Sequence, residues 1–398
     1  MREGIREQPE KSESASGKLS QARRGGNPAT GRRRLTVNFL FSPVASFRTF
    51  RKVFRSWIDL PSRLNSQVST VPPFIHDIST ERIAPRVMES NAQSSSKRLR
   101  MKMKEELQAA SEKLMSETLN LLGVLVRRMS RKQTRRFADL VGDFMHRVIG
   151  IRRELVYRNL SLTFPEKSPD EIRRIARDMY RNVASSLLEV LRLPLIRNRE
   201  DAAALVDIDG EAFLQWYRTR KTGAVFVSAH YGNWELMAMA SGLLVEPIAI
   251  VVKRLRNHEL DQRMNEYRTM RGNRIIYHSQ ALREGLRLLG EGGFLTILGD
   301  QSDHDAVNHG EFLGRRASMY YGPAFFALKA KVPLFFVVCQ GNGDGRYTIK
   351  VREVDTSDLT FSKEAIATLA VRYTRMIEEE IRNRPEEWFW LHNRWKRG

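Results

Sequence analysis

The sequence contains a single cysteine, Cys339, so no disulfide can form within the chain. This cysteine lies in the apolar run PLFFVVCQ, which favours a buried structural thiol over a nucleophile. No stretch reaches the ~18 uninterrupted apolar residues of a membrane-spanning helix, because Glu246 and Pro247 break the longest tract. The N-terminus lacks the pattern of a secretory signal. We therefore expect a protein that stays on the cytoplasmic side and is able to lie on a membrane surface.

Positive charge is abundant and unevenly distributed. The net charge of +21 indicates an anionic partner, such as nucleic acid, an acidic membrane face or an acidic or phosphorylated carrier. Residues 1–100 hold 19 Lys and Arg against 8 Asp and Glu, which places +11 in this quarter. A segment this rich in Arg, Ser, Pro and Gly buries too little apolar area to offset the entropy that it would lose on ordering. We predict a disordered basic leader over residues 1–103, with Met88, Met101 and Met103 as alternative translation starts.

The pattern becomes helical over residues 104–200, where apolar residues recur near a 3.6-residue spacing. The apolar patch 119–126 is followed by two arginines, which suits either a helix leaning into lipid or a buried core helix. Ser168 precedes Pro-Asp-Glu, the pattern of a helix N-cap with proline at the first helical position. We predict a helical, membrane-associating region here.

Residues 201–398 alternate short apolar runs with helical stretches. This alternation predicts an α/β core with a mostly parallel mixed sheet flanked by helices. The predicted strands are residues 224–229, 246–252, 274–278, 293–300, 332–340 and 346–354.

The stretch SAHYGNWE, residues 228–235, places a histidine where a strand gives way to a helix. His230 and Glu235 would lie ~140° apart if both were inside one helix. If His230 instead ends the strand and Asn233 caps the following helix, the Glu235 carboxylate can fold back onto the imidazole. Such a pair is a general base at the carboxyl edge of the sheet, where α/β folds bind ligands. A purely structural His–Glu pair is the alternative.

The chain has no G-x-S-x-G nucleophile elbow in this region, so the base would activate a hydroxyl on a substrate. The motif also belongs to an ordered series of segments that runs to the C-terminus. Over roughly residues 115–397 this series resembles the bacterial lipid A biosynthesis acyltransferases, the lauroyl/myristoyl transferase family. The segments are GAVFVSAHYGNWE, KRLRNHELDQRMNEYRTMRG, GGFLTILGDQ, FLGRRASMYYGPAFFALKAK and RPEEWFWLHNRWK.

The resemblance implies an enzyme that transfers a fatty acyl chain from an acyl carrier protein thioester to a hydroxyl of a lipid A precursor. His230 would deprotonate the hydroxyl and Glu235 would orient the imidazole. An oxyanion would form and need donors, and a guanidinium suits an oxyanion or a phosphate. The resemblance further implies that the enzyme lies at the cytoplasmic face of the bacterial inner membrane, either as a peripheral protein or anchored by its N-terminal helices. The expected substrate or oxyanion contacts are Arg254, Arg271, Asp300, Gln301, Arg315 and Arg316.

Two further possibilities remain open. The ligand types in DQSDHDAVNH, namely Asp303, His304, Asp305 and His309, are those of a metal site. However, their spacing fits no closed zinc pattern, and we expect neither a metal nor a cofactor. The rival functions are acyl transfer to another glycolipid or an aminolipid, with coenzyme A as an alternative donor, and RNA binding. The chain shows no RNA-binding signature of aromatics in a basic strand, so nucleic acid is the less favoured partner.

Overall fold

The computed structural model describes residues 84–255, 257–301 and 308–396. All of them belong to the compact unit Pro43–Gly398. The leader was predicted for residues 1–103, and residues 1–83 of it lie outside the described ones. The first described helix, α2, spans Ala84–Arg128 and begins upstream of the helical region predicted from Lys104. Its early part is rich in Lys, Arg and Met, which favour helix even where they supply no apolar face.

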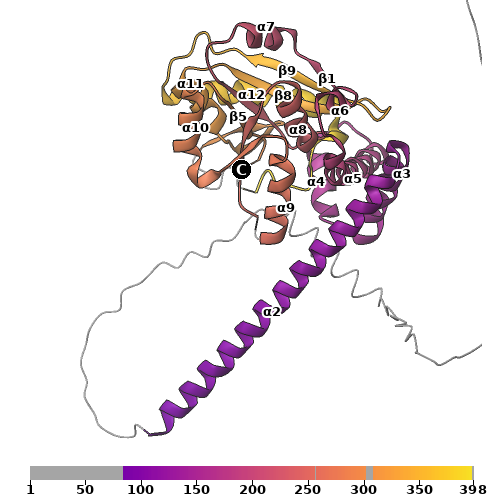
Figure 1. Ribbon diagram of the computed structural model, residues 1–398, viewed down its shortest axis with the longest axis vertical. Coiled ribbons are helices and arrows are strands. Elements are labelled where there is room, and N and C mark those ends of the chain that lie inside the picture. The colour runs from indigo at the N-terminus through magenta and orange to yellow at the C-terminus, as the bar shows by residue number, and fades with distance from the viewer. Residues whose placement is uncertain (1–83, 256, 302–307, 397–398) are drawn as a thin grey trace, which may run out of the picture. The chain divides into compact units, whose positions relative to one another are not determined.

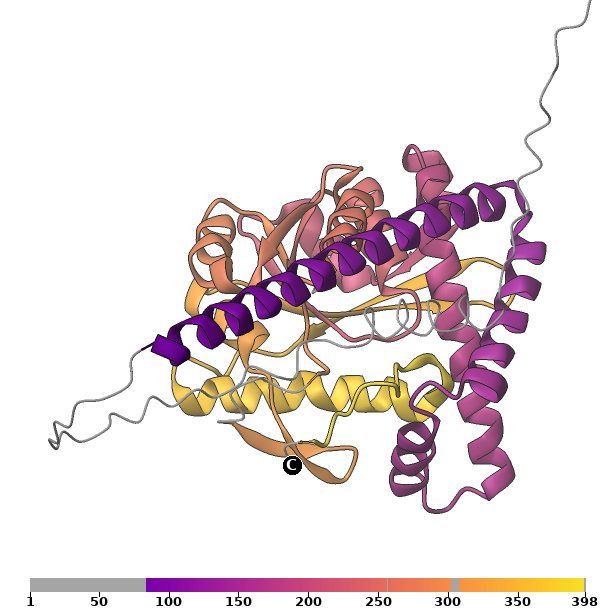
Figure 2. The same cartoon turned by 90° about the horizontal axis from the view of Figure 1, so that it is seen from below.

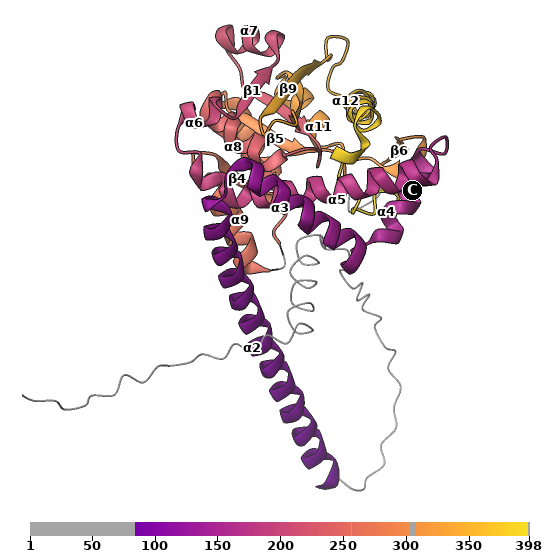
Figure 3. The ribbon, with the colours of Figure 1, turned by 90° about the vertical axis from the view of Figure 1, so that its right-hand side faces the viewer.

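The helices before the sheet gather around α5, which packs against α2, α3, α4 and the π-helix η1. Figure 3 shows α3, α4 and α5 together on one side of the sheet. Ser168 caps α5 as predicted, since its hydroxyl accepts from the Glu171 N–H while the Glu171 carboxylate accepts from the Ser168 N–H. The bounds are α3 Arg131–Phe144, η1 Met145–Ile149, α4 Arg153–Thr163, α5 Pro169–Arg192, η2 Leu193–Leu195 and α6 Arg199–Ala203.

A seven-stranded sheet forms the core, with strand order β1-β9-β8-β2-β5-β3-β4. Every neighbouring pair is parallel except β8 and β9, so the predicted mostly parallel mixed sheet is confirmed. The six predicted strands are present, whereas β1 was not predicted because VDID is short and half polar. The strands are β1 Val206–Asp209, β2 Ala224–Ser228, β3 Ile248–Val252, β4 Arg274–Tyr277, β5 Phe294–Leu298, β8 Leu334–Gly341 and β9 Tyr347–Val354.

Helices cover both faces of this sheet (Figure 1). One group contacts α5 and strands β3, β4, β8 and β9, and the other packs α10, α11 and α12 in sequence across β5, β2 and β9. Because both faces are covered, the central strand β2 is buried at every position. The helices are α7 Glu211–Thr219, α8 Trp234–Leu244 and α9 His258–Thr269 in the first group, then η3 His278–Gln280, α10 Ala281–Gly290, α11 Gly322–Ala330 and α12 Lys363–Asn383.

A separate hairpin, β6 His309–Phe312 with β7 Arg315–Ser318, lies beside α12 (Figure 2). After α12 the chain forms the short helix η4 Pro385–Glu387 and returns beneath the carboxyl edge of β2. Tyr231 pairs there with Trp388 in an isolated antiparallel bridge. The C-terminal segment therefore closes over the point where β2 ends.

The outer face of α2 carries a stripe of exposed apolar side chains. Leu121 is 72% exposed, whereas Met115 and Val126, on another face of the same helix, are buried. The patch predicted at 119–126 is thus neither fully buried nor fully exposed. Within the described residues, no helix is long and apolar enough to cross a membrane. The stripe consists of Met103, Leu107, Leu114, Leu121 and Leu125.

Candidate active site

The loop after β2 positions His230 at the carboxyl edge of the sheet. Gly232 follows with φ +59°, and a Cβ there would lie 1.9 Å from the Cys339 carbonyl oxygen, so only glycine fits. The Asn233 side chain accepts from the Leu236 N–H, which confirms the predicted cap of α8. Phe389 donates its N–H to the His230 carbonyl at 3.0 Å. The backbone on both sides of the histidine is therefore held in place.

The carboxylate that contacts the imidazole is that of Asp300, which follows the adjacent parallel strand β5. His230 Nδ1 lies 2.9 Å from Asp300 Oδ1. The other carboxylate oxygen, Oδ2, accepts from the indole N–H of Trp388 at 2.9 Å. Since β2 and β5 run in the same direction, the residues after each strand meet at one edge. This edge brings together a histidine, an aspartate and a tryptophan that are distant in sequence.

The charge of Asp300 is stabilised inside the protein. Its side chain is 1% exposed, against 19% for His230. Burial by itself would raise the pKa of Asp300, but the charge of His230 and the hydrogen bonds from His230 and Trp388 outweigh burial and leave that pKa lowered. Asp300 therefore remains an anion that holds the Nδ1 proton of the imidazole, which leaves Nε2 as the basic nitrogen.

Polar and aromatic groups surround the ring. The Gln301 amide nitrogen lies 3.2 Å from Nδ1 and 3.4 Å from Nε2 of His230. The Trp234 ring stands edge-on to the imidazole at 5.3 Å between centroids, and the Phe389 ring lies at 6.3 Å. Asp300 and Gln301 thus both lie beside His230, and Asp300 binds the imidazole and the Trp388 indole.

The expected contact between Glu235 and His230 is corrected by the structure. Both carboxylate oxygens of Glu235 accept from the guanidinium of Arg268, with Oε2 at 2.9 Å from Nε. Glu235 lies in the first turn of α8, as predicted, and is buried. The carboxylate of Glu235, 6% exposed, binds a residue of α9 because a buried carboxylate requires a counter-charge, and the partly buried guanidinium of Arg268 supplies it.

The two arginines expected beyond the first motif lie at opposite edges of the sheet. Arg254 follows β3 at the carboxyl edge, where its guanidinium stacks on the Tyr277 ring at 4.6 Å. Arg271 precedes β4 at the amino edge and donates from Nε to the Ile196 carbonyl oxygen at 2.8 Å. Arg254 therefore shares an edge with His230, whereas Arg271 does not, because α9 carries the chain from one edge to the other.

The arginines of the hairpin differ from each other in burial. Arg315 stacks on the Trp395 ring at 3.9 Å, and burial lowers its pKa. Arg316, the next residue on the strand, is exposed because successive side chains point to opposite faces. Neither arginine forms an ion pair among the described residues. Arg316 is therefore the more accessible of the two to an acidic group.

The C-terminal segment contributes three site residues that the sequence analysis did not name. Trp388 binds Asp300, as described above. His392 lies close enough to Asp300 and His230 to sense their charges, and burial lowers its pKa to about 3. Arg394 is 1% exposed, donates to the Ser318 carbonyl oxygen at 2.6 Å, and burial lowers its pKa to about 10. The dense pattern WFWLHNRWK was the signal, but it does not show which strand edge the segment reaches.

The possible metal ligands Asp303, His304 and Asp305 lie outside the described residues. In the remainder of the chain no group of three or more His, Cys, Asp or Glu side chains is arranged to hold a metal. The thiol of Cys339 is fully buried in β8, and burial raises its pKa, which agrees with a structural role.

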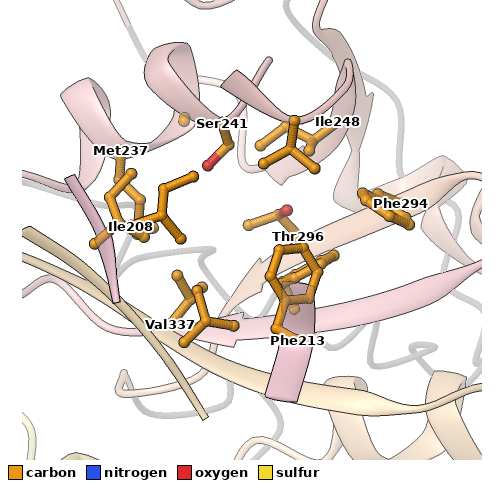
Figure 4. A pocket seen from close by; sticks show the side chains of 13 residues that line it. Ile208, Phe213, Met237, Ser241, Ile248, Phe294, Thr296 and Val337 are labelled. Carbon is orange, nitrogen blue, oxygen red and sulfur yellow. The ribbon is translucent and has the colours of Figure 1, made fainter. Parts of the chain in front are cut away.

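An apolar cavity of about 30 Å³ lies between the sheet and the helices α7 and α8 (Figure 4). Phe213, Met237 and Val337 are among the side chains that line it. Ser241 and Thr296 are its hydroxyl-bearing side chains. Met237 is one helical turn beyond Asn233, so the cavity lies beneath the helix that follows His230.

The family model for bacterial lipid A biosynthesis acyltransferases matches residues 100–397. The chain belongs to this family, and it is an acyltransferase. The resemblance drawn from the ordered motifs is therefore confirmed.

Curated relatives extend this result. The chain is 26% identical over 260 residues to a lipid A biosynthesis palmitoleoyltransferase of Escherichia coli, covering 62% of this chain and 79% of that protein. It is 25% identical over 262 residues to the lipid A biosynthesis lauroyltransferase of the same organism, covering 64% and 83%. It is 28% identical over 261 residues to a phosphatidylinositol mannoside acyltransferase of Mycolicibacterium smegmatis, covering 61% and 79%. A solved 1-acyl-sn-glycerophosphate acyltransferase from Thermotoga maritima aligns with 64% of this chain and 99% of its own, at 16% identity and a TM-score of 0.33.

Proposed function

We propose that this enzyme transfers a fatty acyl chain from an acyl carrier protein thioester to a hydroxyl of a lipid A precursor, with His230 as the general base. The observation that carries the proposal is the hydrogen bond between His230 Nδ1 and the buried carboxylate of Asp300. That bond keeps the proton on Nδ1, so Nε2 is available to accept a proton from the acceptor. A base built in this way without a protein nucleophile suits direct attack by a substrate hydroxyl.

The steps balance without any further reagent. His230 Nε2 takes the proton of the acceptor hydroxyl while its oxygen attacks the thioester carbonyl carbon. The tetrahedral oxyanion collapses, the carbon–sulfur bond breaks, and the imidazolium returns the proton to the leaving thiolate. The Gln301 amide, 3.4 Å from Nε2, is the proposed oxyanion donor. Arg254 on the same edge is proposed to contact a phosphate, and Arg316 an acidic group of the carrier.

Glu235 has a different proposed role from the one that the resemblance implies. Because its carboxylate is bonded to Arg268, we assign it to positioning the first turn of α8 beside His230. Arg271, bonded to a backbone carbonyl at the opposite edge, is assigned to holding the loop before β4.

The proposed location is the cytoplasmic face of the inner membrane, at its anionic surface. The exposed stripe on α2 supports this proposal, because five large apolar side chains on one face of a long helix are costly to leave in water. Arg127 and Arg128 end the same helix and suit anionic headgroups. Glycolipid acceptors reside in the membrane, so an enzyme resting on this surface would reach its acceptor there and meet the carrier protein from the aqueous side.

A second acceptor class is a phosphatidylinositol mannoside, which the relative from Mycolicibacterium smegmatis favours. The proposed chemistry is the same for both acceptors. Mass spectrometry of the lipid product decides between them when purified protein is mixed with acyl carrier protein or coenzyme A thioesters and either acceptor. We expect an O-acylated lipid A precursor with the carrier protein thioester. A product formed only from the mannoside or only from coenzyme A would overturn the corresponding part of the proposal.

His230→Ala tests the general base separately from the choice of donor and acceptor. Loss of the general base is expected to lower turnover ~10²–10⁴-fold, because the acceptor hydroxyl is then not deprotonated. Turnover near that of the unaltered enzyme would contradict the role of His230, even if the acceptor and donor were correctly assigned.

A further inference from the structure

A basic cavity of about 480 Å³ lies in the helical region, formed by η1, α4 and the start of α5. These helices are separate from the strand ends that carry His230 and Asp300 (Figure 3). The volume falls within the range of small-molecule sites, ~300–1,000 Å³. The polar residues that line the cavity are His146, Arg147, Arg153, Tyr157, Ser161, Lys167 and Arg173.

Within the described part of the chain, only one of the four arginine and lysine side chains that line this cavity has an ion-pair partner. No Asp or Glu is among the lining residues. Arg173 is bonded to Asp170, whereas Arg147, Arg153 and Lys167 form no ion pair with any residue in the described part of the chain. Three unpaired cations around one cavity repel one another unless an anion lies between them. The cavity therefore favours an anionic occupant.

His146 supplies a second, independent indication of a ligand. Its side chain is 8% exposed, and Nε2 lies 2.8 Å from the Tyr157 hydroxyl. Its Nδ1 is buried without a hydrogen-bond partner. Burial and the charges of Arg153 and Arg147 lower the pKa of His146, so the ring is neutral. When Tyr157 donates to Nε2, the proton lies on Nδ1, which has no acceptor among the described residues.

Pro169, the first residue of the 24-residue helix α5, also lines the cavity. The first turn of α5 is capped by Ser168 and carries Asp170 and Glu171, so the helix end itself adds little positive charge to the cavity. The donors of the cavity are therefore arginine and lysine, which bind phosphate oxygens in proteins. A phosphate is therefore the anion that this set of donors fits best.

Exposed apolar side chains next in sequence to two lining residues favour a phosphate that belongs to a lipid. Val148 is 58% exposed and follows the lining residue Arg147, and Leu162 is 55% exposed and follows the lining residue Ser161. Phe144, one turn before Val148, is 42% exposed. A free phosphate in water gains nothing from these side chains, whereas a head group at a membrane brings acyl chains next to them.

We propose that the cavity between η1, α4 and α5 binds the phosphate of a lipid head group at the membrane surface, separately from the acyl-transfer site. Arg153 and Lys167 would contact the phosphate oxygens, and the His146 Nδ1–H would donate a hydrogen bond. Val148 and Leu162 would contact the lipid below the head group.

The test uses the full chain and vesicles of phosphatidylcholine with or without phosphatidylglycerol, so it requires no enzymatic activity. Arg153→Gln with Lys167→Gln removes two cavity cations. The matched control, Arg158→Gln with Arg174→Gln, removes two exposed cations from α4 and α5 that do not line the cavity. We expect the cavity pair to weaken binding to phosphatidylglycerol vesicles about tenfold or more, and the control pair by less than about threefold. Equal losses in both pairs, or no loss in the cavity pair, would overturn the proposal.

A second arm separates a lipid phosphate from a free one. Pyrophosphate in solution is titrated against the unaltered protein and the cavity pair, and the thermal unfolding midpoint is followed. Competition by pyrophosphate against vesicle binding, lost in the cavity pair, would support a lipid phosphate in this cavity. A midpoint that rises with pyrophosphate in the unaltered protein, together with unchanged vesicle binding in the cavity pair, would assign the cavity to free phosphate and overturn the lipid assignment.

Discussion

The carboxyl edge of the sheet and the helical region before it treat their charges in opposite ways. At the sheet edge, Asp300 is bonded to both His230 and Trp388, so the protein itself completes the arrangement. In the helical region, Arg153 and Lys167 line a cavity without acidic partners, and Leu121 on α2 is 72% exposed. The first region is therefore already arranged for chemistry, whereas the second gains its missing counter-charges and apolar contacts only from a partner.

The largest expected effect is on kcat, at the carboxyl edge of the sheet that carries His230 and Asp300. Asp300→Asn is expected to lower kcat ~10²–10³-fold, because an amide does not hold the Nδ1 proton as a carboxylate does. Glu235→Gln is expected to change kcat less and to lower the free energy of unfolding instead, by ~1–3 kcal/mol, because the partly buried Arg268 loses its counter-charge. Steady-state kinetics and denaturant unfolding of both variants measure these effects. A reversed ranking in kcat would make Glu235 the residue that orients His230.

The next effect concerns the turn that supports the histidine. Gly232→Ala is expected to lower the free energy of unfolding by ~2–4 kcal/mol, because an added Cβ would meet the Cys339 carbonyl in a left-handed conformation. Chemical denaturation measures the loss. Gly314→Ala, also at positive φ but with open space around the added Cβ, is the matched control and should lose only ~1 kcal/mol. Equal losses would mean that the clash is relieved by a small shift of β8.

The exposed stripe gives a smaller effect, expected in binding rather than in stability. Leu121→Glu with Leu125→Glu should weaken binding to anionic vesicles by about tenfold or more, since each leucine is worth ~1.5–3 kcal/mol when buried in lipid. Leu282→Glu with Val371→Glu changes two exposed apolar residues on α10 and α12 and serves as the control. Vesicle sedimentation compares the two pairs. Similar losses in both pairs would remove the special role of α2.

The smallest effect is a dependence of stability on pH. His392 has a pKa of about 3 when folded, against its ordinary value of 6.5. Below pH 6.5 the unfolded chain therefore binds a proton that the folded protein does not, and stability falls as pH drops towards 3. Each pH unit costs at most ~1.4 kcal/mol from this group. His392→Gln should flatten the slope of unfolding free energy between pH 6 and 5, because the variant lacks the proton that this histidine takes up on unfolding. An unchanged slope would show that His392 is protonated in the folded state.

The strands could be predicted because each buried strand is a short apolar run between turn residues. Phe294–Leu298 and Leu334–Gly341 are such runs, and both form strands. Val206–Asp209 was missed because only its first residue is buried, so its pattern does not differ from that of a loop. The cap at Asn233 was predictable because a cap depends on local sequence alone.

The site could be predicted only in part, because local sequence shows where strands end but not which distant residues meet there. His230, Asp300 and Gln301 were each identified at strand ends, and the parallel sheet brings them together. The identity of the carboxylate was predicted wrongly, because Glu235 is near in sequence whereas Asp300 is near in space. The contact of Trp388 with Asp300 was not predicted, because it depends on where the chain returns after α12.

The amino-acid sequence alone determined the class of this protein. Apolar runs alternating with helical patterns specify the layers of an α/β core, and the ordered motifs identify the acyltransferase family. Only the tertiary structure decided which carboxylate holds His230, which arginine shares its edge, and where unpaired cations surround a cavity. Periodicity and capping act between residues a few positions apart, whereas a hydrogen bond across strands depends on strand order, which no short stretch of sequence contains.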